Sequence, residues 1–205
     1  DCFSVFGLVR EVAVLTGNTP KWPLIQVKED EAAASGDLIQ VGIDAADLCS
    51  RFSARVLKNV KIGPSPEWMQ SCLEGAGIRS INNVVDVTNF VMVELGQPMH
   101  AYDYDAIAGN CLTARRAVAG EELHTLADSA RKATGDELVI ADAEKAAGLA
   151  GVMGGLETEI TEQTTTVVLE AAAFNGPSIR RTSRACSRHS EASGRFERGV
   201  DVTQT

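Results

Sequence analysis

The stretch that decides the fold of this chain lies at residues 80–107 and reads SINNVVDVTNFVMVELGQPMHAYDYDAI. Its first half predicts a helix, because apolar side chains recur at helical spacing. Together they would form one apolar face, made of Val84, Val85, Val87, Phe90, Val91 and Leu95. Gly96 follows as the residue that adopts the left-handed conformation at a helix end most cheaply. The sequence therefore predicts a buried helix that stops at Gly96.

A polar segment follows this helix directly. Pro98 lacks a backbone donor and pushes Gln97 into an extended conformation, so His100 emerges from a stiff turn. Thr88 and Asn89 carry neutral donors and acceptors on the preceding helix. We therefore expect His100, Thr88 and Asn89 to form a polar site, although both helix residues would serve equally well as local buttresses.

The rest of the chain mixes helices and strands. A first helix is predicted from Ser4 to Gly17, with inward side chains Val5, Leu8, Val9, Val12 and Leu15. A shorter helix begins at Pro66 and ends at Gly75 or Gly77. Strands are predicted at 24–28, 38–43, 52–60, 112–118, 123–126, 137–141, 147–152 and 166–170. We predict an α+β fold in which residues 1–205 form one domain, with mixed sheets in a sandwich-like core and flanking helices.

Composition limits the functional classes without choosing one. The chain has 205 residues, of which 44% are hydrophobic, as expected of a globular domain. Its apolar runs are shorter than the roughly 18 residues needed to cross a bilayer, so we expect no membrane span and a cytoplasmic location. Five cysteines without a CxxC pair, and three histidines far apart, argue against a disulfide framework and against a metal site.

The charge is unevenly distributed. The formal net charge of −9 disfavours binding to phosphate groups. Residues 176–205, however, carry six arginines against three acidic residues. We predict that this segment faces RNA through Arg180, Arg181, Arg184 and Arg188, although the same residues are also typical of a solvated helix face.

Several motifs share an order with a known family. They are NNVVDVTNFVMVELGQPMHAYDYD at 82–105, GVMGG at 151–155, VLEA at 168–171, RHSEAS at 188–193 and RFERGVD at 195–201. In this order they resemble the editing module, or B3/B4 domain, of the β subunit of bacterial phenylalanyl-tRNA synthetase. The opening DCFSVFGLVREVAVLTG is similar to the entry helix of that family. Members of the family usually have an Asp-Gly hairpin near residues 126–132, whereas this chain has Ser129, so we expect a longer or different turn.

The resemblance implies a function. Such a module hydrolyses the ester of mischarged Tyr-tRNA(Phe) after transfer, with a positioned water and no covalent nucleophile. The expected partners are the tRNA(Phe) acceptor end carrying tyrosine, the remainder of the β subunit and the α subunit, in an α2β2 enzyme. ATP and Mg²⁺ belong to the synthetic site of the parent enzyme, and no cofactor is expected here. By the same resemblance we expect the chain to be a fragment of a longer subunit, and it is not expected to aminoacylate tRNA.

The resemblance also assigns roles to residues. Glu170 would accept the phenolic proton of tyrosine, and a phenylalanyl ester would leave this carboxylate unpaired. His100 would orient the substrate, while Thr88 and Asn89 would hold the attacking water or the ester carbonyl. From the residues alone, Glu170 could equally cap a strand or pair with an arginine.

The walls of the amino-acid pocket are implied in the same way. Gly151, Gly154 and Gly155 would bring backbone close to the ligand, although three glycines between strands usually form only a turn. Ala192 would leave room for the aromatic ring. Ser190 stands where many relatives carry threonine and keeps the hydroxyl group.

Two other functions remain open at this point. The same fold would serve as a non-catalytic module that binds tRNA or supports the synthetase. It would also suit a free-standing relative that edits aminoacyl-tRNA in trans. The presence of both Glu170 and His100 favours editing over a purely structural role.

Overall fold

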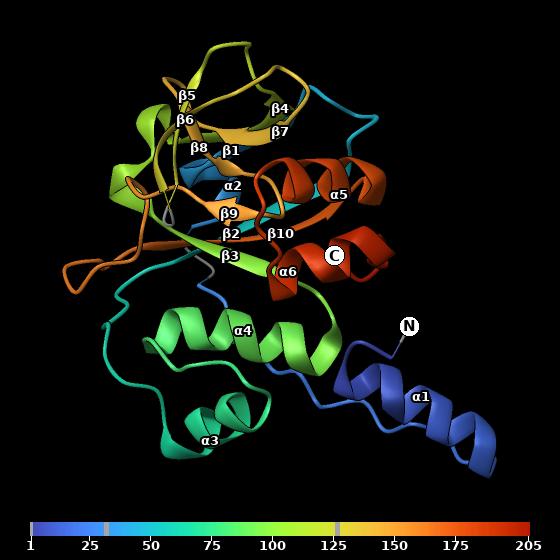
Figure 1. The fold of residues 1–205 in the computed structure, drawn as a ribbon. Helices are drawn as coiled ribbons and strands as arrows, with labels where there is room; N and C mark the ends of the chain where they lie inside the picture. The colour runs from blue at the N-terminus through green and yellow to red at the C-terminus, as the bar shows by residue number, and fades with distance from the viewer. Residues whose placement is uncertain (1, 31–32, 126–127) are drawn as a thin grey trace.

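The computed structural model describes residues 2–30, 33–125 and 128–205 (Figure 1). The first part contains α1 (Val5–Thr16), α2 (Ser35–Leu38), β1 (Gln40–Ile43), β2 (Cys49–Leu57), α3 (Glu67–Gly75), α4 (Asn83–Leu95) and β3 (Met99–Asp103). The middle part contains η1 (Tyr104–Ala106), η2 (Ala108–Asn110), β4 (Cys111–Arg116), β5 (Glu122–Thr125), β6 (Asp128–Lys132) and β7 (Leu138–Ala141). The last part contains β8 (Ala146–Leu149), β9 (Met153–Gly154), β10 (Val167–Phe174), α5 (Gly176–Ala185) and α6 (Glu191–Arg198).

The strands form three sheets. A five-stranded sheet has the order β1-β4-β7-β8-β9, in which only the β1–β4 pair is parallel. A three-stranded antiparallel sheet has the order β2-β10-β3, and β5 pairs with β6 as a separate hairpin. Strand β10, the last strand in the chain, thus lies between β2 and β3, which both precede it by more than sixty residues. Only the folded chain reveals this arrangement.

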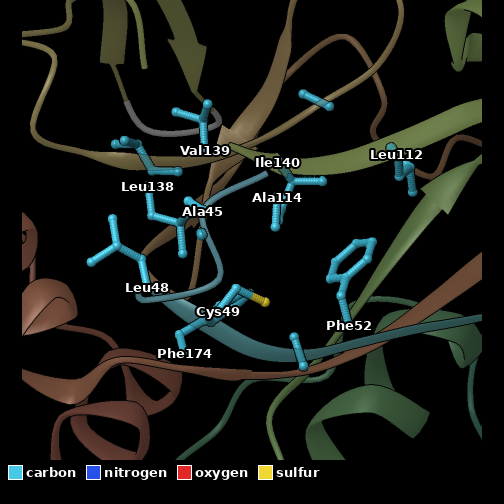
Figure 2. Close-up of a cluster of buried hydrophobic side chains, with 14 of the residues drawn as sticks. Ala45, Leu48, Cys49, Phe52, Leu112, Ala114, Leu138, Val139, Ile140 and Phe174 are labelled. Atoms are coloured by element: carbon cyan, nitrogen blue, oxygen red, sulfur yellow. The ribbon is translucent and has the colours of Figure 1, made fainter. Parts of the chain in front are cut away.

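The main core lies between the two larger sheets. Figure 2 shows Phe52 and Phe174 of the three-stranded sheet on one side, and Leu112, Leu138 and Ile140 of the five-stranded sheet on the other. All of these side chains are buried. The predicted α+β fold with a sandwich-like core and flanking helices is therefore confirmed.

Helix α4 is the predicted buried helix. Asn82 accepts hydrogen bonds from the backbone N–H groups of Val84 and Val85, and Gly96 ends the helix with φ of 84°. The predicted inward face is only partly correct, because Val87 is 41% exposed. Besides Val84, the residues that α4 buries are Asp86, Thr88 and Met92. Asp86 and Thr88 are polar, and their hydrogen-bond partners lie in the neighbouring loop and on the helix backbone. A pattern of apolar residues does not predict the burial of such side chains.

Asp86 holds the loop that leads into α4. Its carboxylate is fully buried and accepts hydrogen bonds from the hydroxyl groups of Ser65 and Ser80, both at 2.5 Å. The backbone N–H of Ile81 donates to the same carboxylate at 2.8 Å. Asp86 therefore joins the start of α4 to the segments on both sides of α3.

The predicted apolar face of α1 is wrong. The helix begins after the cap Ser4 and ends at Gly17 as expected. However, Val5, Leu8, Val12 and Leu15 are between 50% and 84% exposed, and Val9 is only half-buried. Helix α1 extends away from the sheets and contacts α4 (Figure 1). It buries Phe6, which stacks on Trp22 with ring centroids 4.7 Å apart.

The structure also differs from the sequence prediction at three places. Residues 24–28 form no strand, because none of the described strands pairs with them, and Leu24 and Ile25 are 85% and 71% exposed. Strand β3 was not predicted, and His100 lies in this strand directly after the turn at Gln97 and Pro98. Ser129 lies within β6 and not in the hairpin turn, since Thr125 pairs with Asp128. Residues 126 and 127 of the predicted turn lie outside the described residues.

The other predicted strands overlap observed ones, with ends that differ by a few residues. The largest difference is in β10, which continues through Ala171, Ala172 and Ala173 to Phe174. Pairing with β2 along all three alanines, and with β3 at Ala171, stabilises this low-propensity run as a strand. Among the described residues, no helix combines the length and apolar character that crossing a bilayer requires.

Candidate functional site

A cavity of about 390 Å³ lies where α4, β3, β10, the β8–β9 segment and the start of α6 meet. Its walls include eight of the nine residues that were predicted to act on or bind the substrate. These are Thr88, Asn89, His100, Gly151, Gly154, Glu170, Ser190 and Ala192. The structure thus brings together residues that are up to about a hundred positions apart in the sequence.

Glu170 and His100 meet because of the strand register. Strand β10 pairs with β3 so that Glu170 stands directly opposite His100, and Tyr102 lies two residues further along β3. Residues opposite each other in an antiparallel pair share a face of the sheet, and so do residues two apart in one strand. The His100 and Tyr102 rings contact each other edge to face, with centroids 4.5 Å apart.

Tyr102 is the residue that sequence reasoning missed. Its hydroxyl group donates a hydrogen bond to Oε2 of Glu170, and both side chains are buried. The expectation that Glu170 stays unpaired in the absence of a substrate hydroxyl is therefore wrong. The alternation along residues 99–103 would have placed Tyr102 beside His100 if the segment had been interpreted as a strand.

Burial changes the protonation of these groups. Desolvation raises the pKa of Glu170 to about 7, although the hydrogen bond from Tyr102 acts in the opposite direction. Desolvation also lowers the pKa of His100 to about 4, so the imidazole is neutral at pH 7. The pKa of Tyr102 lies well above its usual value because of burial and the neighbouring Glu170. A neutral imidazole and a carboxylate that titrates near neutrality therefore share one wall of the cavity.

Thr88 and Asn89 differ in what they offer a ligand. The Thr88 hydroxyl group donates to the backbone carbonyl of Val85 at 2.7 Å, so in this conformation its oxygen can only accept from a ligand. The Asn89 side chain is half-buried at the cavity wall and makes no hydrogen bond with the described residues. Asn89 is accordingly the better candidate to hold a water or an ester carbonyl.

The glycine segment has two different roles. Gly151 has φ of 66°, and a Cβ atom there would lie 2.8 Å from the Phe196 ring, so this position requires glycine. Gly151 and Gly154 line the cavity, whereas Gly155 does not. A Cβ atom at Gly155 would lie 2.2 Å from the carbonyl oxygen of Ala147, to which the Gly155 N–H donates at 2.9 Å. Gly155 therefore permits close backbone packing and is not among the residues that line the pocket.

Ser190 and Ala192 enter the cavity from the start of α6. Ser190 caps this helix, because its hydroxyl oxygen accepts from the Ser193 N–H while the Ser193 hydroxyl oxygen accepts from the Ser190 N–H. The Ser190 hydroxyl also donates to the carbonyl of Val152 at 3.4 Å. Ala192 adds only a methyl group to the wall. The cap fixes where the helix begins and hence how closely it approaches the glycine segment.

The predicted RNA-facing arginines lie outside this cavity. Arg180, Arg181 and Arg184 are exposed on α5 and line a separate hollow of about 310 Å³ with Pro177 and Glu197. Arg188 follows α5 and does not line this hollow. Three of the four predicted residues therefore form one basic surface, which we call the α5 arginine surface.

Within residues 2–30, 33–125 and 128–205, no three histidine, cysteine or acidic side chains gather as a metal site would require. The cavity wall contains no lysine or arginine from the described residues. Its chemistry is therefore that of a largely apolar cavity whose polar groups include the Glu170 carboxyl group, a neutral imidazole, side-chain amides and backbone groups.

Known proteins that are similar to this chain agree with one another. A family model described as the B3/4 domain matches residues 48–205. The phenylalanine–tRNA ligase β subunit of Moorella thermoacetica is 51% identical over 202 residues, which are 98% of this chain and 25% of that protein. The β subunit of Bacillus cereus strain ZK is 44% identical over 205 residues, which are 100% of this chain and 25% of that protein. The chain thus spans about a quarter of the length of the curated relatives it matches.

A solved structure is also similar. It is an N-terminal fragment of the phenylalanyl-tRNA synthetase β subunit from Pyrococcus horikoshii, with a TM-score of 0.49 and 12% identity. The match covers 82% of this chain and 51% of that one. Because the family model covers most of the residues, this chain belongs to the B3/4 domain family.

Proposed function

We propose that this chain is the editing domain of a phenylalanine–tRNA ligase β subunit and hydrolyses the ester of Tyr-tRNA(Phe). The observation that carries the proposal is the buried Glu170 carboxyl group on the wall of a cavity that also contains His100 and Asn89. The names of the 51% and 44% identical relatives support the assignment to this subunit.

The proposed reaction needs little from the protein. A water molecule attacks the carbonyl carbon of an already activated ester, and the terminal ribose hydroxyl of the tRNA leaves. Positioning of the water and stabilisation of the oxyanion are enough to accelerate such a reaction. Asn89 is suited to hold the water or the carbonyl oxygen. His100 acts first by positioning, because a pKa of about 4 makes it a weak base at pH 7.

Selectivity would come from the phenol of the substrate. A pocket shaped for phenylalanine rejects tyrosine by only about 10²-fold, since excluding one hydroxyl group is difficult, so a second site has to recognise that group. Glu170 provides the acceptor, with one of its two oxygens already engaged by Tyr102. A phenylalanyl ester would leave the other oxygen without a donor in a buried place, which costs about 1 to 3 kcal/mol.

The partners and cofactors follow from the same assignment. We propose that the tRNA acceptor end, the remainder of the β subunit and an α subunit complete the enzyme. ATP and Mg²⁺ would bind to the synthetic site, outside this chain. In this arrangement the domain supplies hydrolysis, while the other parts present the tRNA.

The direct test uses the domain within its complete synthetase. We expect Glu170→Ala to lower the rate of Tyr-tRNA(Phe) hydrolysis at least tenfold because the phenol acceptor is lost. Phenylalanine charging should stay intact, since the synthetic site lies outside this chain. We expect His100→Ala to slow hydrolysis as well, by loss of positioning. Glu162→Ala is the matched control, since Glu162 is exposed and does not line the cavity.

If both cavity variants hydrolyse Tyr-tRNA(Phe) at the wild-type rate, the editing proposal fails. The non-catalytic tRNA-binding module would then be the better description. The α5 arginine surface is the observation that favours this second function.

The α5 arginine surface yields a separate prediction. Combined replacement of Arg180, Arg181 and Arg184 by alanine should weaken tRNA binding by the synthetase and flatten its salt dependence. If each arginine contacts one phosphate, the slope of log affinity against log salt should decrease by about 2 to 3. The measurement is a titration of tRNA binding at several salt concentrations.

Arg116→Ala is the control for this prediction, because Arg116 pairs with Asp47 at 2.6 Å on another part of the surface. An unchanged slope in the triple variant would show that the α5 arginine surface is a solvated helix face and does not contact RNA.

A further inference from the structure

The hydrogen bond from Tyr102 to Glu170 changes what the cavity offers to a substrate. A carboxylate has about four acceptor positions on its two oxygens. Tyr102 occupies Oε2, and no other described side chain or backbone group donates to Glu170. Because Glu170 also lines the cavity, the unoccupied acceptor positions belong to the surface that a ligand meets.

We propose that Tyr102 is a positioning residue that sets the specificity of this site: it holds one oxygen of Glu170 and leaves the other for the phenol of a tyrosyl ester. This proposal rests on the proposed editing function. It adds a residue to which the family resemblance assigned no role, and it explains why a buried carboxyl group is stable in the unliganded cavity.

The first part of the argument is orientation. Tyr102 is 2% exposed, and its ring is held edge to face against His100, so its hydroxyl group has a fixed position. A hydrogen bond from a fixed donor restricts the rotation of the Glu170 side chain. Without the hydroxyl group, the carboxyl group could turn away from the cavity or take up a proton.

The second part of the argument is charge. An ionised carboxylate accepts from a phenol more strongly than a protonated carboxyl group does. The Tyr102 hydrogen bond favours the ionised form of Glu170 and opposes the effect of burial. The group therefore titrates near neutrality instead of remaining protonated, and the phenol acceptor is available at physiological pH.

Other titratable groups face Glu170 from the elements around it. His100 stands opposite on β3, and Cys49 on β2 has its thiol pKa raised to about 12 by burial and by the charge of Glu170. Glu159 and Glu191 line the same cavity. None of these groups donates a hydrogen bond to Glu170, so Tyr102 is the described residue whose removal should alter its titration most directly.

The test compares Tyr102→Phe with wild type in the complete synthetase. Phenylalanine keeps the ring and its contact with His100 while removing the hydroxyl group. Loss of a hydrogen bond to a charged group should raise the midpoint of the Glu170 titration by about 1 to 2 pH units. At pH 7 the rate of Tyr-tRNA(Phe) hydrolysis should then fall about 5- to 50-fold and recover as the pH rises toward 9.

Tyr104→Phe is the matched control, because the Tyr104 hydroxyl group donates to the carbonyl of Leu38, and Tyr104 does not line the cavity. This variant should keep the wild-type pH profile. A rate that falls equally at every pH in Tyr102→Phe would indicate only a structural role for Tyr102 and would overturn the proposal.

A second readout does not depend on activity. The 205-residue chain labelled with ¹³C at the glutamate carboxyl carbons can be titrated by NMR, with Glu170→Gln to assign the signal. A higher midpoint in Tyr102→Phe supports the proposal, and an unchanged midpoint overturns it. If the wild-type enzyme does not hydrolyse Tyr-tRNA(Phe) at all, the proposed function fails, while this midpoint still decides whether Tyr102 controls Glu170.

Discussion

Replacement of Asp86 by alanine should lower the free energy of unfolding by about 3 to 5 kcal/mol, because three hydrogen bonds to one buried group are lost. The donors are the hydroxyl groups of Ser65 and Ser80 and the backbone N–H of Ile81. Ser65 is itself buried and would be left without this acceptor. Urea denaturation of the 205-residue chain, followed by circular dichroism, measures the change.

Asp105→Ala is the matched control for this loss. Asp105 is exposed, and its carboxylate accepts no hydrogen bond from the described residues, so its replacement should change stability by less than about 0.5 kcal/mol. Since Ile81 and Asn82 line the cavity, Asp86→Ala should also disturb the site. Equal stability of the two variants would mean that Asp86 does not anchor the loop before α4.

The second large effect is a pair of opposing pH dependences. The pKa of Glu170 is raised from 4.5 to about 7, so between these values the folded state keeps a proton that the unfolded chain has lost. The stability that Glu170 contributes is therefore present below about pH 4.5 and is lost as the pH rises through 7. At 1.36 kcal/mol per pH unit, the full change is about 3 kcal/mol.

His100 acts with the opposite sign. Its pKa is lowered from 6.5 to about 4, so the unfolded chain binds a proton that the folded state does not. The stability that His100 contributes is present above about pH 6.5 and is lost as the pH falls toward 4. In the wild-type protein the two trends offset each other between about pH 4.5 and 6.5, and the stability should change little there because of these groups.

Single replacements should separate the two trends. In Glu170→Gln the remaining His100 contribution should make stability rise with pH between 4.5 and 6.5, by up to about 3 kcal/mol. In His100→Gln the remaining Glu170 contribution should make stability fall over the same range. Urea denaturation at several pH values provides the measurement.

The exposed residues Glu162 and His189 provide the controls for this experiment. Glu162→Gln and His189→Gln should follow the wild-type dependence on pH. If the free energy of unfolding changed with pH in the same way in Glu170→Gln and His100→Gln, this would contradict the opposite pKa shifts that burial imposes on the two groups.

Much of the fold could be predicted because local signals were strong. The α4 helix has a cap, an apolar period and a terminating glycine, and its end at Gly96 was predicted correctly. The α1 helix was also predicted, but not its exposed face, since helical periodicity shows that a helix is amphipathic without showing what covers it. Residues 24–28 had strand propensity but pair with no strand of the described part of the chain, which propensity alone cannot reveal.

The candidate site was predictable through motifs more than through chemistry. Motif order identified Glu170 and His100, and the structure then showed that strand pairing places them opposite each other. Tyr102 and Asp86 were missed for a common reason. Both are polar or amphipathic groups whose burial depends on partners from distant segments, and a local pattern contains no sign of those partners.

The measurement that tests the central claim most directly is the hydrolysis of Tyr-tRNA(Phe) and Phe-tRNA(Phe) by the wild-type synthetase, compared side by side under the same conditions. The proposed function predicts that the tyrosyl ester is hydrolysed well above the spontaneous rate while the phenylalanyl ester is spared. Hydrolysis of both esters at the same rate, or of neither, would contradict the conclusion that this cavity selects tyrosine through Glu170.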